Sequence, residues 1–223
     1  MKKSLLIVLV AAFLTQGLVR AEEAKADPKV EALLAKLKAD VEASKPKIKD
    51  GATDDEKKTA EERHTKMQKL VVEKLLTLCT NPVFVKETQA QNDKKMTAEE
   101  IKKIDDEWQK AEEELPIQKE KMTNTCAKEI IKLVKDLRVI GETFVMDNQG
   151  GNVGQNALTS DYMQGDESKW QKSYNEAKGG VDIAEPKFDK SANTVEQKVS
   201  LPIIDPVGNV VGAICWGIRV DQL

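Results

Sequence analysis

The first half of the chain carries apolar residues at helical spacing. They recur at i, i+3, i+4, i+7 and i+11, as Val30, Leu33, Leu34, Leu37 and Val41. This spacing places them on one face of a helix, and Asp27-Pro28 in front of them is a helix-start signal. We therefore expect an amphipathic helix from about residue 28 to residue 44.

Three further helices follow from the same kind of pattern. Thr53 and the acidic residues after it open a longer helix. Its apolar stripe consists of Met67, Leu70, Val71, Leu75 and Leu78. Thr97 and Glu100 form a capping box ahead of a third helix, whose stripe consists of Ile101, Ile104, Trp108, Ala111 and Leu115. A fourth helix is expected from Cys126 to Leu137.

In the second half of the chain the pattern changes to strands. Residues 140–146 and 152–155 flank a glycine-containing turn and predict a hairpin. Residues of a second hairpin alternate with a period of two, which is typical of a half-buried strand. One side carries Val195, Val199, Leu201 and Ile203, and the other carries Glu196, Lys198 and Ser200. The partner strand, residues 210–220, is nearly all apolar and is expected at the centre of the sheet. A loop with a short helix over 159–177 and a short strand over 181–184 should lie between the hairpins.

Composition divides the chain at the same place. Charged residues dominate residues 22–137, whereas glycine, asparagine and β-branched residues take over in residues 138–223. Strands that follow a run of helices indicate an α+β fold, with the helical region packing on an antiparallel sheet. The lysine and glutamate runs of the helices mix both signs, and the formal net charge is -3. Mixed signs are typical of solvated helix faces, so we expect no nucleic-acid partner.

Residues 1–21 have the features of a secretory signal peptide. A basic start precedes an apolar run from Leu5 to Leu14, and a small-residue cleavage site ends at Ala21. A membrane anchor would need about 20 apolar residues, and Thr15 interrupts the run. Removal is therefore favoured over retention, and we expect a periplasmic or secreted protein that is soluble after cleavage.

Several segments resemble single-Cache, PDC-type extracytoplasmic sensor domains, which have a PAS-like fold. They are Phe144–Gly150, Thr159–Trp170, Phe188–Ser191 and Val199–Pro202 through Val211–Ala213. The segment Thr159–Trp170 is the specific one, and the match reaches back to Asn92–Trp108. The resemblance implies a PAS-like Cache sheet in the second half, covered by a helical excursion. Most Cache domains hang from a membrane receptor, whereas this chain stops at Leu223, so we expect it to need a membrane sensor or receptor as partner.

The resemblance also places a small-molecule pocket between the sheet and the excursion. The candidate ligand-binding residues are Asp161, Tyr162, Gln164, Asp166, Lys169, Trp170 and, from the helical half, Trp108. They supply acceptors, donors and flat apolar walls, and Lys169 suits a ligand carboxylate. The alternative is that the acidic residues fix the loop and the aromatic residues pack in the core. For Trp108, on a helical stripe, the core role is the preferred one.

The three cysteines leave two alternatives open. Cys79 and Cys126 end and begin predicted helices, so they could form a disulfide in an oxidising compartment. The other alternative is a pair of buried thiols. Cys215 lies in the apolar last strand and is expected to be an inert core residue.

Enzyme chemistry finds little support in the residues. His64 is the single histidine and sits among lysines and glutamates, so no nucleophile-histidine pair is expected. Cysteine and histidine spacings typical of zinc sites are absent from the sequence. Gly150-Gly151 lies in a hairpin turn and precedes no helix, which argues against a phosphate-binding loop. We expect neither catalysis, nor a metal, nor a cofactor.

Two functions from different classes therefore remain. The first is a sensor-type protein that binds a small metabolite, such as an organic acid or an amine, and relays its occupancy to a partner. The second is a structural or interaction protein that uses the Cache-like half as a scaffold and its helices for protein contacts. A homodimer through the long N-terminal helices suits either function, because their apolar stripes need burial.

Overall fold

The computed structural model describes residues 26–189 and 194–223. The predicted signal peptide lies outside the described residues. Within them, no helix is both long enough and apolar enough to cross a membrane.

Six helices precede the sheet in the described chain. They are α1 (Pro28–Ala43), α2 (Asp54–Leu70), α3 (Pro82–Asn92), α4 (Ala98–Lys110), α5 (Pro116–Thr123) and α6 (Thr125–Asp136). The π-helical turn η1 (Val71–Leu75) and the 3-10 turn η2 (Leu76–Thr80) continue α2. Asp27 caps α1, and complete capping boxes at Thr53 and Thr97 open α2 and α4, so the predicted starts of these three helices are confirmed.

Five antiparallel strands form one sheet in the order β2-β1-β5-β4-β3. They are β1 (Ile140–Met146), β2 (Asn152–Gln155), β3 (Asp182–Asp189), β4 (Thr194–Ile204) and β5 (Val210–Arg219). Both predicted hairpins are present, and β5 pairs with β1 and with β4 at the centre of the sheet. A short helix, α7 (Ser168–Tyr174), lies between β2 and β3, and η3 (Val220–Gln222) follows β5. The prediction of an α+β fold, with N-terminal helices ahead of a PAS-like antiparallel sheet, is confirmed.

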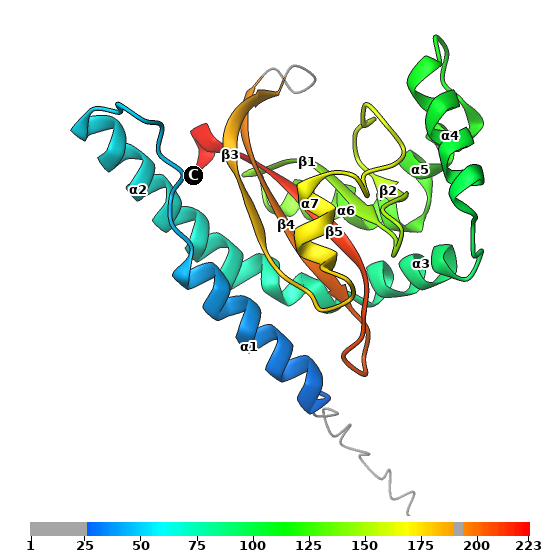
Figure 1. The fold of residues 1–223 in the computed structure, drawn as a ribbon, viewed down its shortest axis with the longest axis horizontal. Coiled ribbons are helices and arrows are strands. Elements are labelled where there is room, and N and C mark those ends of the chain that lie inside the picture. Colours follow the sequence, from blue (N-terminus) through cyan, green and yellow to red (C-terminus); the bar gives the residue numbers. More distant parts are fainter. Residues whose placement is uncertain (1–25, 190–193) are drawn as a thin grey trace, which may run out of the picture.

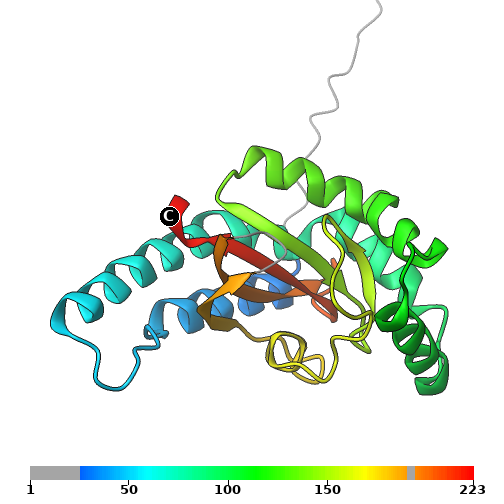
Figure 2. The same ribbon diagram turned by 90° about the horizontal axis from the view of Figure 1, so that it is seen from above.

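The sheet is covered on both faces (Figures 1 and 2). On one face, buried residues of α1, the α2–η2 helix, α3 and α6 join those of the strands in one hydrophobic core, with Leu37, Leu75 and Ile130 on the helix side and Ile214 and Trp216 on the sheet side. The other face carries α7, which contacts β4 and β5. The helical half therefore shares its main core with the sheet.

Three details differ from the predicted elements. The helix α3 was not predicted, although Asn81-Pro82 is a start signal: the Asn81 side chain accepts from the first helical N–H groups. The third predicted stripe is too long, because α4 ends at Lys110 and Leu115 already belongs to the start of α5. Val195, expected on the inward side of β4, is 41% exposed, because it lies at the start of the strand near the hairpin tip.

The central strand gives the first prediction. Replacing Ile214 by alanine leaves a cavity in the main core, where this residue is fully buried, and should lower the free energy of unfolding by about 2 to 5 kcal/mol. Val207→Ala is the control, because Val207 lies in the turn before β5 and is 55% exposed. Urea unfolding of both variants measures the difference; equal stabilities would contradict the described core.

Candidate functional site

The face of the sheet beneath α7 carries a row of three buried side chains. Ser200 of β4 pairs with Cys215 of β5, which pairs with Phe144 of β1. Each is at most 1% exposed. The Ser200 hydroxyl has no hydrogen-bond partner of normal geometry, and its cross-strand neighbour is a thiol, which is only a weak donor. This row forms the floor of what we call the sheet-face site.

The helix α7 and the loop before it cover this floor. The Trp170 indole N–H donates to the Asp147 carbonyl at 2.9 Å, and its ring stacks on Tyr174 at 4.9 Å between centroids. The Lys169 ammonium lies 5.2 Å from the centre of the Phe144 ring, where a cation–π attraction operates. It also donates to Gln164 Oε1 at 2.9 Å. The predicted residues Trp170, Lys169 and Gln164 therefore lie together over the sheet.

A second lysine borders the floor from within the sheet. Lys198 of β4 donates to Glu142 of β1 at 2.7 Å and to Glu196 at 2.8 Å. Burial alone would lower the pKa of Lys198, but the two carboxylates outweigh it and raise the pKa above its usual value. Both Lys169 and Lys198 lower the pKa of the Cys215 thiol electrostatically, against a larger raising effect of burial. The two ammonium groups thus flank the same buried row.

Glycine makes room for one of these carboxylates. Glu196 is only 2% exposed, although its place in the alternating pattern predicts the outward side of β4. Its carboxylate lies over Gly141 and Gly217, where any Cβ would collide with it. The absence of two side chains thus creates a slot for a buried carboxylate, which shares the Lys198 ammonium with Glu142.

The predicted acidic residues have different surroundings. Asp161 accepts hydrogen bonds from Ser160 and Gln164, and partial burial raises the pKa of its carboxyl. Through Gln164 it belongs to the same group as Lys169. Asp166 is exposed, so it lies at the rim of the site at most.

Tyr162 and Trp108 lie in a separate cluster. Their rings pack at 5.8 Å between centroids, in a small core with Ile101 of α4. The Tyr162 hydroxyl accepts from Gln91, and the Trp108 N–H donates to the Thr159 carbonyl at 2.9 Å. The alternative of a core role therefore describes both aromatic residues, and they fasten the excursion to the helical half.

Sequence reasoning missed the floor of the sheet-face site, the ion pair beside it and one anchor of its cover. Phe144, Ser200 and Cys215 form the floor, and Lys198 and Glu142 lie beside it. Asp105 of α4 accepts from the N–H groups of Tyr162 and Met163 at 2.9 Å. The alternation in β4 does set Lys198 and Ser200 on one side of the strand. That side seemed to face water, because nothing in the sequence revealed that α7 returns to cover it.

The cysteines are free thiols, so the disulfide alternative for Cys79 and Cys126 does not hold. Both residues are fully buried. Cys79 lies in η2, whereas the Cys126 side chain packs on Gly154 of β2, so the two face different neighbours. Burial raises the pKa of Cys79 to about 12, which keeps its thiol protonated and unreactive.

The histidine pairs with a serine hydroxyl at the end of α1. His64 is 5% exposed, and its Nε2 lies 3.0 Å from the Ser44 hydroxyl, which also donates to the Val41 carbonyl at 2.6 Å. Among the described residues no group of three His, Cys, Asp or Glu side chains could hold a metal ion.

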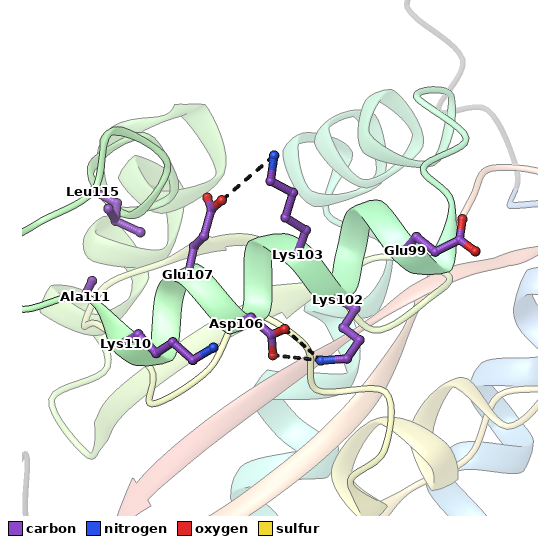
Figure 3. A pocket seen from close by; sticks show the side chains of 8 residues that line it. All are labelled: Glu99, Lys102, Lys103, Asp106, Glu107, Lys110, Ala111 and Leu115. Atoms are coloured by element: carbon purple, nitrogen blue, oxygen red, sulfur yellow. Dashed lines mark hydrogen bonds and ion pairs between the residues drawn. The ribbon is translucent and has the colours of Figure 1, made fainter.

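A hollow of about 550 Å³ lies along α4, but its lining does not suit a specific ligand (Figure 3). Lys102 and Asp106 form one ion pair there at 2.8 Å, and Lys103 and Glu107 form another at 4.0 Å. These side chains are 46 to 77% exposed, so the surface is a solvated helix face. The sheet-face site remains the better candidate.

Comparison with known proteins gives structural matches only. No protein-family model and no curated protein matches the chain. Solved structures that match include the sensor domain of the V. cholerae histidine kinase DctB, at 10% identity and a TM-score of 0.44, covering 87% of this chain and 60% of that one. Another is the ligand-binding domain of the Campylobacter jejuni chemoreceptor Tlp3 with 4-methylisoleucine, at 11% identity and a TM-score of 0.39, covering 87% and 62%. A third is the ligand-binding domain of Mlp24 with asparagine, at 13% identity and a TM-score of 0.37. That match covers 87% of this chain and 60% of the other.

The three matched structures are one sensor domain and two ligand-binding domains. The chain spans about 60% of the length of the DctB, Tlp3 and Mlp24 domains.

The glycine slot gives the second prediction. In Gly141→Ala the new Cβ meets the Glu196 carboxylate, and overpacking should lower the free energy of unfolding by about 1 to 3 kcal/mol. Glu196→Ala alone removes an ion-pair partner of Lys198 and also destabilises the fold. In the double variant the new Cβ meets no carboxylate. Its loss of unfolding free energy, measured by urea unfolding, should therefore be smaller than the sum of the losses in the two single variants. Strictly additive losses would show that the carboxylate does not occupy the slot.

Proposed function

We propose that the chain is a non-catalytic binding module of sensor type, which holds a small metabolite at the sheet-face site and relays its occupancy to a partner. The observation that carries the proposal is the arrangement of Lys169 and Lys198 around the buried Ser200, beneath α7. The Ser200 hydroxyl has only the Cys215 thiol beside it, which is a weak hydrogen-bond partner. A bound ligand would supply a stronger one.

The chemistry of the site favours a small, charged organic molecule. Its floor is apolar at Phe144, and its rim holds charged groups of both signs, such as Lys169 and Asp161. A mostly apolar site with a few placed polar groups binds small solutes and fixes their orientation. An organic acid would compete for Lys169, whereas an amine would compete for Asp161, so both classes belong in a ligand search.

The same groups argue against catalysis at this site. Cys215 is the one nucleophilic thiol of the floor, and burial raises its pKa, so it stays in the unreactive protonated form. Lys198 is held charged by its carboxylate partners and cannot act as a base. What the site offers is recognition.

Export and partnership complete the proposal. A cleaved signal peptide over residues 1–21 would deliver the protein to the periplasm or beyond. Occupancy of the sheet-face site would then be read by a membrane sensor or receptor. The element that would transmit occupancy is α7, which covers the site and is joined to the β1–β2 turn through Trp170 and to β3 through Lys172 and Asp182.

The third prediction tests ligand binding. A thermal-shift screen of residues 22–223 against organic acids, amines, amino acids and purines should yield at least one stabilising compound. A ligand at 100 times its Kd stabilises by about 2.7 kcal/mol, which is readily seen as a higher Tm. The shift of an organic acid should vanish in Lys169→Gln, and the shift of an amine should vanish in Asp161→Asn, because each of these residues belongs to the site.

The matched control is Asp166→Asn, the same chemical change five residues away at an exposed position. It should keep the full shift. If no compound stabilises the protein, or if Asp166→Asn loses as much of the shift as the site variant that matches the ligand's charge, the binding proposal fails. The function as a scaffold for protein contacts then takes its place.

A further inference from the structure

A second hollow, of about 450 Å³, lies at the β3 edge of the sheet, where α1 and the C-terminal end of α7 approach that strand. Three separate parts of the chain wall it: the C-terminal half of α1 with the segment after it, the C-terminal end of α7 with its following loop, and the start of β3. It shares no residue with the sheet-face site.

The charges around this hollow do not balance. Four lysines line it, namely Lys36, Lys45, Lys47 and Lys172, against the two carboxylates of Asp40 and Asp182. Both carboxylates are already paired, Asp40 with Lys36 at 3.2 Å and Asp182 with Lys172 at 2.9 Å. Within the described chain, Lys45 and Lys47 have no acidic partner. The hollow therefore has an excess of two positive charges.

The segment that carries these two lysines is held in place. The Gln68 amide donates to the carbonyls of Val41 and Ser44 at 2.8 and 3.3 Å, and the Ser44 hydroxyl contacts His64 Nε2 at 3.0 Å. Pro46, between the lysines, restricts the backbone further. Lys45 and Lys47 are exposed like the charged residues along α4, but their backbone is held, so only their side chains must be ordered when an anion binds.

The opposite wall is fixed as well. Asn175, Glu176 and Ala177 all adopt the left-handed conformation, with φ of 50°, 52° and 62°. Such a run of non-glycine residues is strained and persists only where its surroundings impose it. Lys36 contributes by donating to the Gly179 carbonyl at 3.1 Å. Asn175, which lines the hollow, adds an amide that can donate to an anion.

We propose that this hollow is a second binding site, which takes a small dianion such as a phosphate group or a short dicarboxylate. The two uncompensated ammonium groups of Lys45 and Lys47 match the two negative charges of a dianion. The other two lysines of the hollow, Lys36 and Lys172, are already neutralised by their ion pairs, so they add little repulsion. The site is independent of the proposed metabolite site, because the two share no residue.

The test is isothermal titration of the protein with inorganic phosphate and, separately, with malonate, at constant ionic strength set with chloride. Both dianions should bind the unmodified protein. In Lys45→Gln/Lys47→Gln the affinity should fall roughly tenfold or more, since two charges close to the anion are lost. Binding of phosphate alone, or of malonate alone, would identify which dianion the hollow prefers.

The control variant is Lys38→Gln/Lys49→Gln, which loses the same net charge from the same part of the chain but from residues outside the hollow. It should bind both dianions as the unmodified protein does. If both double variants lose the same affinity, the effect comes from the overall charge of the protein, and the proposal is overturned. The absence of dianion binding to the unmodified protein would overturn it as well. Neither result bears on the thermal-shift screen, whose variants lie at the other site.

Discussion

The fold depends on burying the central strand β5 on both of its faces. Its hydrogen bonds are satisfied by β1 on one side and β4 on the other. Ile214 and Trp216 point to the helices, and Ala213 and Cys215 point to α7. The second pair is small, which lets a short helix approach the sheet closely. Neither half of the chain could bury this strand alone, so the helical half and the excursion are both parts of one structure.

Covering the second face has a chemical consequence. Polar residues of β4 and β1 that would otherwise meet water are enclosed, and each must find a partner. Lys198 finds Glu142 and Glu196, the latter in a slot that glycine provides. Ser200 finds only the Cys215 thiol, a weak partner. An enclosed hydroxyl with a weak partner, beside positioned charges, is the physical basis of the proposed ligand site.

The sequence predicts this architecture better than it predicts the site. The helix start at Thr53, the capping box at Thr97 and the apolar run of β5 depend on neighbours in sequence, and these predictions are confirmed. The surroundings of Glu196 could not be predicted, because its burial depends on Gly141 in another strand. The choice between a ligand-binding role and a core role for Tyr162 could not be made for the same reason. Its contacts with Gln91 and Trp108 arise only once residues 159–177 fold back on the helices.

The central claim is that a small molecule binds between α7 and the sheet, and amide NMR shifts on adding the best compound of the screen test it most directly. The account predicts that the largest shift changes fall on Ser200, Cys215 and Lys169, with α4 unaffected. Changes confined to α4, or spread evenly over the molecule, would contradict it and leave the fold as a scaffold without a ligand.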